Sequence, residues 1–337
     1  MPTVQSKGSG KPNNLILLIA AFAAVYLIWG STYLAIKYAI GTIPSFLMAG
    51  VRFSVAGIIL LIWARLSPGY TRPKAVHWRT AIIVGALLLG LGNGGVVIAE
   101  HYISSSLAAL LIASTPFWIV ILSWGFMGAG RPKLGVVLGL VVGFAGVVLL
   151  VAGQPVSTGS DESHGQTIGI VAIMIATIGW AIGSLYGSRA ESAKPNTLAA
   201  GMQMLSGGVI MLIVSLVIGE WSTFQFSAVS TTSLIALAYL IAFGALIAYT
   251  AYNWLLQNAS PSAVSTYAYI NPAIAVILGW SIAGESLTGQ MLLGAAVIVA
   301  SVALITTSNR TKESVKEKKI RESITSTTSV KPQSASA

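Results

Sequence analysis

The chain has 337 residues, of which 55% are hydrophobic and only 8% are charged, and its mean hydropathy is +0.81. Soluble domains usually carry about 25% charged residues, so most of this surface must face lipid and a soluble globule is excluded. The net charge of +10 indicates basic loops that face the cytoplasm. Nucleic-acid binding is not indicated, because the sequence has no soluble basic domain with interleaved aromatic residues. The absence of cysteine excludes disulfides, thiol catalysis and cysteine metal sites.

Ten apolar stretches follow a polar N-terminal segment, 1–14, and each approaches the roughly 20 residues that a membrane helix needs. The first stretch is longer than the ~7–15-residue core of a cleavable signal, so it is interpreted as a retained span. The expected fold class is therefore an all-α integral membrane protein with ten transmembrane helices. Their ranges are 15–36, 45–64, 80–99, 104–126, 134–152, 168–187, 196–218, 233–256, 262–283 and 288–307.

The basic residues predict the orientation of these spans. With the N-terminus inside, 17 of the 19 Lys and Arg residues fall on the cytoplasmic side, in the N-terminal segment, alternate loops and the tail. Only Lys37 and Arg52 lie elsewhere, whereas acidic residues such as Glu100, Glu220 and Glu285 fall on the opposite side. Both termini are therefore predicted to be cytoplasmic.

A repeated frame divides the chain into halves. The segment Pro44-Ser-Phe-Leu47-Met-Ala49-Gly50 returns 151 residues later as Pro195-Asn-Thr-Leu198-Ala-Ala200-Gly201. Because each half holds five spans, an odd number, the second half is expected to enter the membrane inverted, as in alternating-access transporters. The predicted divisions are a repeat over 15–152, an external linker over 153–167, a second repeat over 168–307, and a disordered basic cytoplasmic tail over 308–337.

Two related motifs carry a family resemblance. Tyr102-Ile-Ser-Ser-Ser-Leu-Ala-Ala-Leu-Leu-Ile-Ala-Ser-Thr-Pro116 and Ala259-Ser-Pro-Ser-Ala-Val-Ser-Thr-Tyr-Ala-Tyr-Ile-Asn-Pro272 each precede a glycine-rich helix, and Gly284-Glu285 precedes the last span. Over 15–307 the chain resembles the EamA-type exporters of the drug/metabolite transporter superfamily. The resemblance implies an inner-membrane exporter of small metabolites or drugs. The first half departs from the pattern, with Ala129-Gly130-Arg131 in place of the Gly-Glu pair.

Polar and aromatic side chains at span depth are the candidates for a substrate site. Each central proline frees a backbone carbonyl, which must face protein or a water-filled cavity. The alternatives are packing kinks for the prolines, interhelical hydrogen bonds for the asparagines, and lipid contact for the aromatic residues. The predicted substrate-binding residues are Trp29, Tyr33, Asn93, Thr115, Pro116, Trp180, Asn253, Tyr267, Asn271 and Pro272.

Arg52 and Glu100 are predicted to form a charge pair or to take part in coupling. Arg52 lies about 10 Å below the outer end of its span, where a charge without a partner is costly. Glu100, at similar depth, is the candidate partner. Arg52 could instead reach the headgroups or bind an anionic substrate. Glu100 could instead carry a coupling proton or sit wet at the outer face.

The sequence predicts a secondary transporter and no enzyme. The three histidines, at 77, 101 and 164, lack metal-ligand spacing, and there is no Walker-type loop, so neither metal nor cofactor is expected. The expected function is secondary active export of small, amino-acid-like metabolites or drugs. The alternative is a membrane-embedded enzyme or a lipid-handling protein. The expected partners are a small-molecule substrate, membrane lipid and a coupling proton, without nucleic acid, in a monomer or homodimer.

Overall fold

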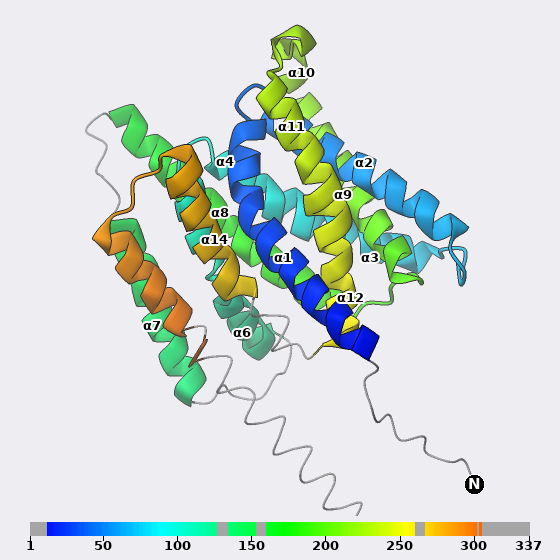
Figure 1. Cartoon of the computed structure of the whole chain (residues 1–337), viewed down its shortest axis with the longest axis horizontal. Coiled ribbons are helices and arrows are strands. Elements are labelled where there is room, and N and C mark those ends of the chain that lie inside the picture. Colours follow the sequence, from blue (N-terminus) through cyan, green and yellow to red (C-terminus); the bar gives the residue numbers. More distant parts are fainter. Residues whose placement is uncertain (1–11, 127–133, 153–159, 260–266, 302, 305–337) are drawn as a thin grey trace, which may run out of the picture.

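The computed structural model describes residues 12–126, 134–152, 160–259, 267–301 and 303–304, which hold helices and no β-strand (Figure 1). The first half contains α1 (Pro12–Ala39), α2 (Ser45–Leu66), α3 (Ala75–Val84), η1 (Gly85–Asn93), α4 (Gly94–Ala99), α5 (Ser105–Ile112), α6 (Thr115–Phe126) and α7 (Leu134–Ala152). The second half contains α8 (Ser160–Gly187), α9 (Asn196–Val217), α10 (Glu220–Thr223), η2 (Phe226–Ala228), α11 (Thr231–Tyr239), η3 (Leu240–Tyr249), α12 (Thr250–Asn258), α14 (Tyr267–Ala283) and a last apolar helix over Gly289–Ser301.

Seven helical stretches of the described chain are long and apolar enough to cross a membrane. They are Leu15–Ala39, Ser45–Leu66, Ala75–Ala99, Ser105–Phe126, His164–Gly187, Asn196–Val217 and Thr231–Leu255. Three shorter apolar helices, Leu134–Gly146, Ile270–Ala283 and Gly289–Ser301, overlap the remaining predicted spans. Large apolar side chains such as Ile62, Trp63 and Phe126 are exposed, as lipid-facing positions require. The prediction of an all-helical membrane protein is confirmed, while the count of ten spans stays a prediction.

The start of α8 differs from the sequence expectation. The helix begins at Ser160, within the range predicted as the external linker. Apolarity marks the part of a helix that lipid can surround, but a helix satisfies its own backbone hydrogen bonds and can continue into water. Hydropathy therefore predicts the lipid-embedded part of this helix better than its first turn.

Two of the predicted spans contain a π-helical segment. In the third predicted span η1 lies between α3 and α4, and in the eighth η3 lies between α11 and α12. π-Helices are rare and occur frequently at functional sites. Because the third and eighth spans hold equivalent places in the two halves, the same irregularity occurs once in each repeat.

Helices α2 and α9 make the most extensive contact between elements of the described chain, and they run antiparallel. Gly50 lies against Gly208, and Gly57 lies against Gly201. A Cβ atom on Gly57 would lie 2.6 Å from the backbone nitrogen of Leu205, so only glycine permits this approach. In the repeat frame Gly50 corresponds to Gly201 and Gly57 to Gly208. The two contacts are therefore one contact made twice.

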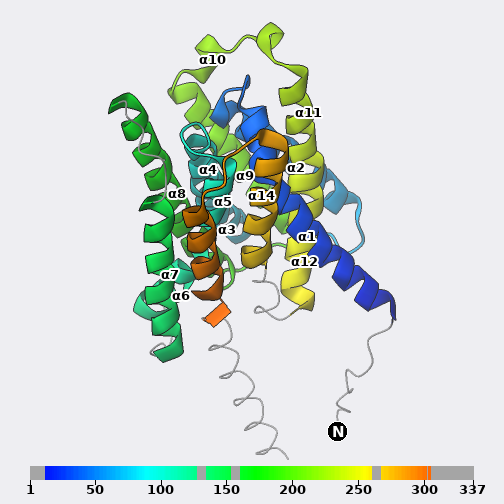
Figure 2. The ribbon, with the colours of Figure 1, turned by 60° about the vertical axis from the view of Figure 1, so that its left-hand side comes forward.

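The two halves interleave around the middle of the bundle. Helix α1 packs on α11, η3, α12 and α14 of the second half, and α8 packs on α3, η1, α4, α5 and α6 of the first. Figures 1 and 2 both place α1 beside α14, with α7 at the periphery of the bundle. The first helix of each half thus packs against the third and fourth spans of the other half.

The fourth predicted span is broken just before its proline. Helix α5 ends at Ile112 and α6 begins at Thr115, one residue before Pro116. The hydroxyls of Ser114 and Thr115 donate to the carbonyls of Leu111 (2.7 Å) and Ile112 (2.6 Å). These bonds provide donors for carbonyls at the break, which lipid could not supply. Pro272, in contrast, lies within α14.

Candidate functional site

A cavity of about 100 Å³ lies between the two halves, which is room for several waters or part of a small solute. Its walls come from α1, α2, η1, α4, the α5–α6 break, α8, α9, η3 and α14. The structure brings together eight of the ten residues predicted to bind substrate, namely Trp29, Tyr33, Asn93, Thr115, Trp180, Tyr267, Asn271 and Pro272. Both π-helical segments contribute to the same cavity.

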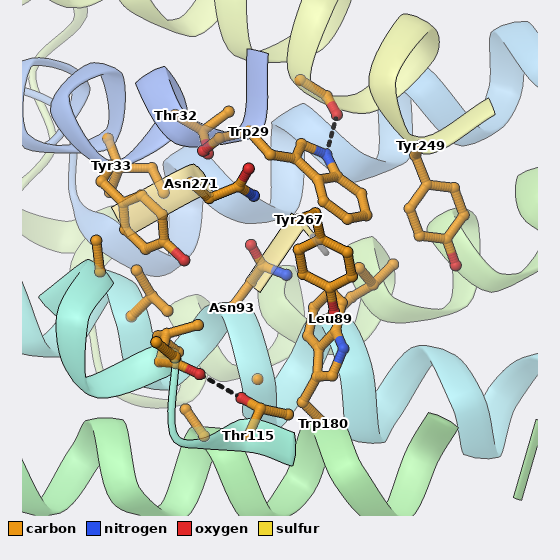
Figure 3. Close-up of a pocket in the computed structure, with 18 of the residues that line it drawn as sticks. Trp29, Thr32, Tyr33, Leu89, Asn93, Thr115, Trp180, Tyr249, Tyr267 and Asn271 are labelled. Carbon is orange, nitrogen blue, oxygen red and sulfur yellow. Dashed lines mark hydrogen bonds between the residues drawn. The ribbon is translucent and has the colours of Figure 1, made fainter. Parts of the chain in front are cut away.

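Aromatic side chains form one wall of this cavity. The rings of Trp29 and Trp180 meet edge to face with their centroids 6.4 Å apart, and the centroid of Tyr267 lies 5.5 Å from that of Trp29 (Figure 3). The indole nitrogen of Trp29 donates to the carbonyl of Gly244 in η3 at 3.2 Å. A Cβ on Gly92 in η1 would lie 3.0 Å from the Trp180 ring. Each tryptophan therefore lies against a glycine of the other half's π-helical segment.

Polar groups are distributed across the cavity between these rings. The Asn271 amide, oriented to satisfy both of its ends, donates to the carbonyls of Tyr26 (3.2 Å) and Tyr267 (3.3 Å). Asn93 donates to the carbonyl of Leu88 over 3.4 Å, a long bond. Figure 3 shows Asn93, Asn271 and Tyr33 around one open space. The site combines an apolar aromatic surface with a small number of hydrogen-bonding groups, as solute pockets usually do.

Two predicted residues do not line the cavity. The side chain of Asn253 turns back along α12 and donates to the carbonyl of Tyr249 at 2.9 Å. Pro116 follows the break, where the residues before it, Ala113 and Thr115, face the cavity instead. In both cases a neighbour along the helix occupies the place that the sequence analysis assigned to the named residue.

Arg52 lines the cavity and is only 4% exposed. Its guanidinium carbon lies 4.7 Å from the centroid of the Phe53 ring, and its buried Nε has no hydrogen-bond partner among the described residues. The equivalent position of the second half is Gln203, whose side-chain oxygen accepts a hydrogen bond from Tyr249 at 2.6 Å. The two repeats therefore differ at this position, with a cation at the cavity wall in one half and a neutral amide bonded to Tyr249 in the other.

Glu100 does not form the predicted direct pair with Arg52. Within the described ranges the two side chains make no ion pair at 4.0 Å or less, and both Glu100 carboxylate oxygens are buried without a hydrogen-bond partner. Glu100 is 5% exposed and does not line the cavity. It is thus neither a wet surface residue nor a direct partner of the cation.

The sequence analysis did not predict the ion pair between Lys37 and Glu285. Lys37 donates to Glu285 at 2.8 Å, and the Glu285 carboxylate also accepts bonds from the backbone and hydroxyl groups of Ser105 and Ser106 at the start of α5. Burial raises the pKa of Glu285, but these hydrogen bonds and the Lys37 charge outweigh burial and hold the pKa at about 2. The available signal was Lys37, one of only two basic residues that lie away from the predicted cytoplasmic side.

A second carboxylate binds the start of α2. Glu220 accepts hydrogen bonds from the backbone nitrogens of Phe46 (3.1 Å) and Leu47 (2.8 Å), where the helix has free donors. His101 contacts the hydroxyl of Ser45 nearby. Burial lowers the pKa of His101, although the charge of Glu220 acts in the opposite direction. Carboxylates thus accept hydrogen bonds at the N-terminal ends of α2 and α5, on the side of the cavity where α1 ends.

Comparison with known proteins gives the family. The sequence profile of the EamA-like transporter family matches residues 15–152 and 167–307. The chain belongs to the EamA-like transporter family. It is 39% identical over 272 residues to YedA of Escherichia coli K12, named as an uncharacterized inner membrane transporter, covering 80% of this chain and 84% of that protein. YvbV of Bacillus subtilis, named as an uncharacterized transporter, is 26% identical over 79% of this chain and 83% of its own length.

A solved crystal structure has the same fold. It superposes with a TM-score of 0.62 at 19% identity and covers 89% of this chain and 99% of the other. At that identity the match speaks for the fold alone. Membership of the family and seven apolar membrane-length helices make the chain an integral membrane protein of a transporter family.

Proposed function

We propose that this protein is a secondary active transporter that exports small metabolites or drugs across the bacterial inner membrane by alternating access through the central cavity. The observation that carries the proposal is the cavity itself. It lies between the two halves, it is lined by equivalent elements of both, and it joins aromatic with polar side chains. Substrate sites at the interface of inverted repeats are the usual arrangement in secondary transporters.

The proposed topology has ten spans, inverted repeats and both termini in the cytoplasm. The charge distribution supports the orientation, because 17 of 19 basic residues fall on one side of such an arrangement. The packing of α2 on α9 supports the inversion. These helices hold equivalent places in the repeats, yet they run antiparallel and make the Gly50–Gly208 contact again as Gly57–Gly201. A twofold relation between the halves, with its axis across the helices, has this consequence.

The names of the relatives support the inner-membrane location, since YedA is named as an inner membrane transporter. No feature of the described residues favours the alternative of a membrane-embedded enzyme or a lipid-handling protein over a transporter. Export rather than import is proposed from the family resemblance, and a proton is proposed as the coupling ion, with the buried Glu100 as its candidate carrier.

The experiment is an untargeted comparison of extracellular metabolites from cells with and without overexpression of the protein. Export predicts compounds enriched outside the overexpressing cells. Trp180→Ala and Asn271→Ala should remove that enrichment at unchanged protein levels, because both side chains line the cavity. The matched control is Trp124→Ala, since Trp124 is 50% exposed on the surface of α6. Enrichment that survives both cavity changes would overturn the assignment of this site.

A further inference from the structure

We infer that the central cavity recognises an apolar or aromatic solute that carries a carboxylate, and that Arg52 binds the carboxylate. The inference rests on the proposed function and narrows its substrate class. It depends on one cation, buried at the cavity wall, whose charge no side chain of the described residues pairs directly.

Arg52 is held in place by packing rather than by an anion. Its side chain lies against the ring of Phe53 at 4.7 Å, and a Cβ on Gly244 would come within 2.9 Å of its Nη2 atom. Gly244 therefore makes room for the guanidinium group between α2 and η3. The group is positioned before any ligand arrives, which lowers the entropic cost of binding.

Two acidic residues near this end of the bundle, Glu285 and Glu220, are committed elsewhere. Glu285 is bonded to Lys37 and to the start of α5, and Glu220 is bonded to the start of α2. Glu100 has no hydrogen-bond partner among the described residues, and its carboxyl group acts on Arg52 electrostatically only from beyond 4.0 Å. A cation 4% exposed at membrane depth is costly without compensation. A carboxylate in the cavity would provide it through charge-assisted, bidentate hydrogen bonds.

The rest of the cavity suits the remainder of such a molecule. Trp29, Trp180 and Tyr267 present ring surfaces within a few ångströms of one another, and Asn93 and Asn271 are the amides nearby. Aromatic walls alone would also accept a cation. Arg52 excludes cationic solutes because it carries the same charge. Only one half of the protein offers a cation, since the equivalent Gln203 is neutral and bonded to Tyr249, so the solute is held in one orientation.

The test is equilibrium binding to the purified full chain in detergent, with three probes of one shape. Radiolabelled phenylacetate is the anion, phenylacetamide is its neutral analogue and phenethylamine is the cation. We expect phenylacetate to bind at least tenfold more tightly than the amide, and the amine not to compete. Arg52→Gln should remove the difference by weakening the acid at least tenfold while the amide changes less than twofold. Arg52→Lys should retain part of the preference, since it keeps the charge but loses the planar fork.

The control variant is Arg65→Gln, the same change on the same helix at an exposed residue, and it should bind all three probes as the unmodified protein does. Equal affinity for acid and amide, no binding of the acid, or a preference that survives Arg52→Gln would each overturn the inference. If Arg52→Gln does not fold, the ratio of the affinities for phenylacetate and phenylacetamide, measured in the unmodified protein and in Arg52→Lys, still tests the inference. Added phosphatidylglycerol should not displace phenylacetate; displacement would assign Arg52 to a lipid headgroup instead.

This experiment separates the inference from the proposed function. Export that depends on Trp180, together with equal acid and amide binding, leaves the transporter standing and rejects the carboxylate. Binding of the acid that depends on Arg52, without export that depends on Trp180, keeps the anion site and rejects the transport role.

Discussion

Glu285 connects the segment after α14 with α1 and α5, and its replacement should destabilise the folded protein. The contacts of its carboxylate give the size of this effect. Its carboxylate accepts bonds from Lys37 and from the backbone and hydroxyl groups of Ser105 and Ser106. A fall of its pKa from 4.5 to about 2 on folding corresponds to about 3 kcal/mol, at 1.36 kcal/mol for each pKa unit. The Lys37 side chain is 36% exposed and can be rehydrated, so the part of the Glu285→Ala destabilisation that depends on ionisation of Glu285 should be about 3 kcal/mol or less.

The pH dependence has a definite sign. Because the pKa of Glu285 is lower in the folded protein than its ordinary value, the stabilisation is complete above about pH 5 and is lost as the pH falls toward 2. Thermal unfolding of the detergent-solubilised protein should therefore show a Tm difference between unmodified and Glu285→Ala protein that is constant from pH 8 to pH 5 and narrows below pH 4.

The matched control is Glu191→Ala, since Glu191 contacts His77 at 3.1 Å but its side chain is 60% exposed. Exposed pairs contribute about 0–1 kcal/mol, so this variant should unfold close to the unmodified protein. A Tm for Glu285→Ala equal to that of Glu191→Ala would refute the reasoning. So would a difference that stays constant down to pH 3.

Two further predictions follow from helix packing and topology. Gly57→Ala places a methyl group 2.6 Å from the Leu205 backbone nitrogen and should cost about 1–3 kcal/mol. Gly125→Ala, in α6 with open space around it, should not destabilise the protein in the same unfolding assay. A reporter enzyme that works only outside the cytoplasm should be silent when fused after Ser308 and active when inserted at Ser160. The opposite pattern would contradict the orientation.

The sequence predicts much of the membrane architecture because lipid imposes a strong pattern on it. Apolar length locates the spans, and the repeated positions Trp29 and Trp180 indicate an inward role, which agrees with the cavity they line. Eight of ten candidate site residues meet there for the same reason, since polar or aromatic groups at span depth are placed against protein or a cavity.

The remaining features depend on packing between segments that are far apart in the sequence, so no local sequence pattern predicts them. Hydropathy has the same appearance for α-helical and π-helical segments, so it does not reveal η1 and η3. Hydropathy also does not show that the Asn253 side chain donates back to Tyr249 instead of lining the cavity. Depth alone suggested Arg52 and Glu100 as partners. The structure pairs Lys37 with Glu285 across 248 positions of the chain instead, because carboxylates are used at the free amides of helix starts.

The central claim is that the cavity opens alternately to the two sides of the membrane, and cysteine accessibility tests it directly. The chain has no cysteine, so Thr115→Cys introduces a single thiol into the cavity wall. A membrane-impermeant maleimide should label it both in spheroplasts and in inside-out vesicles. Ile277→Cys, at a residue 59% exposed on α14, serves as the lipid-facing control and should resist labelling in both. Labelling of Thr115→Cys from one side only, or from neither, would contradict alternating access through this cavity.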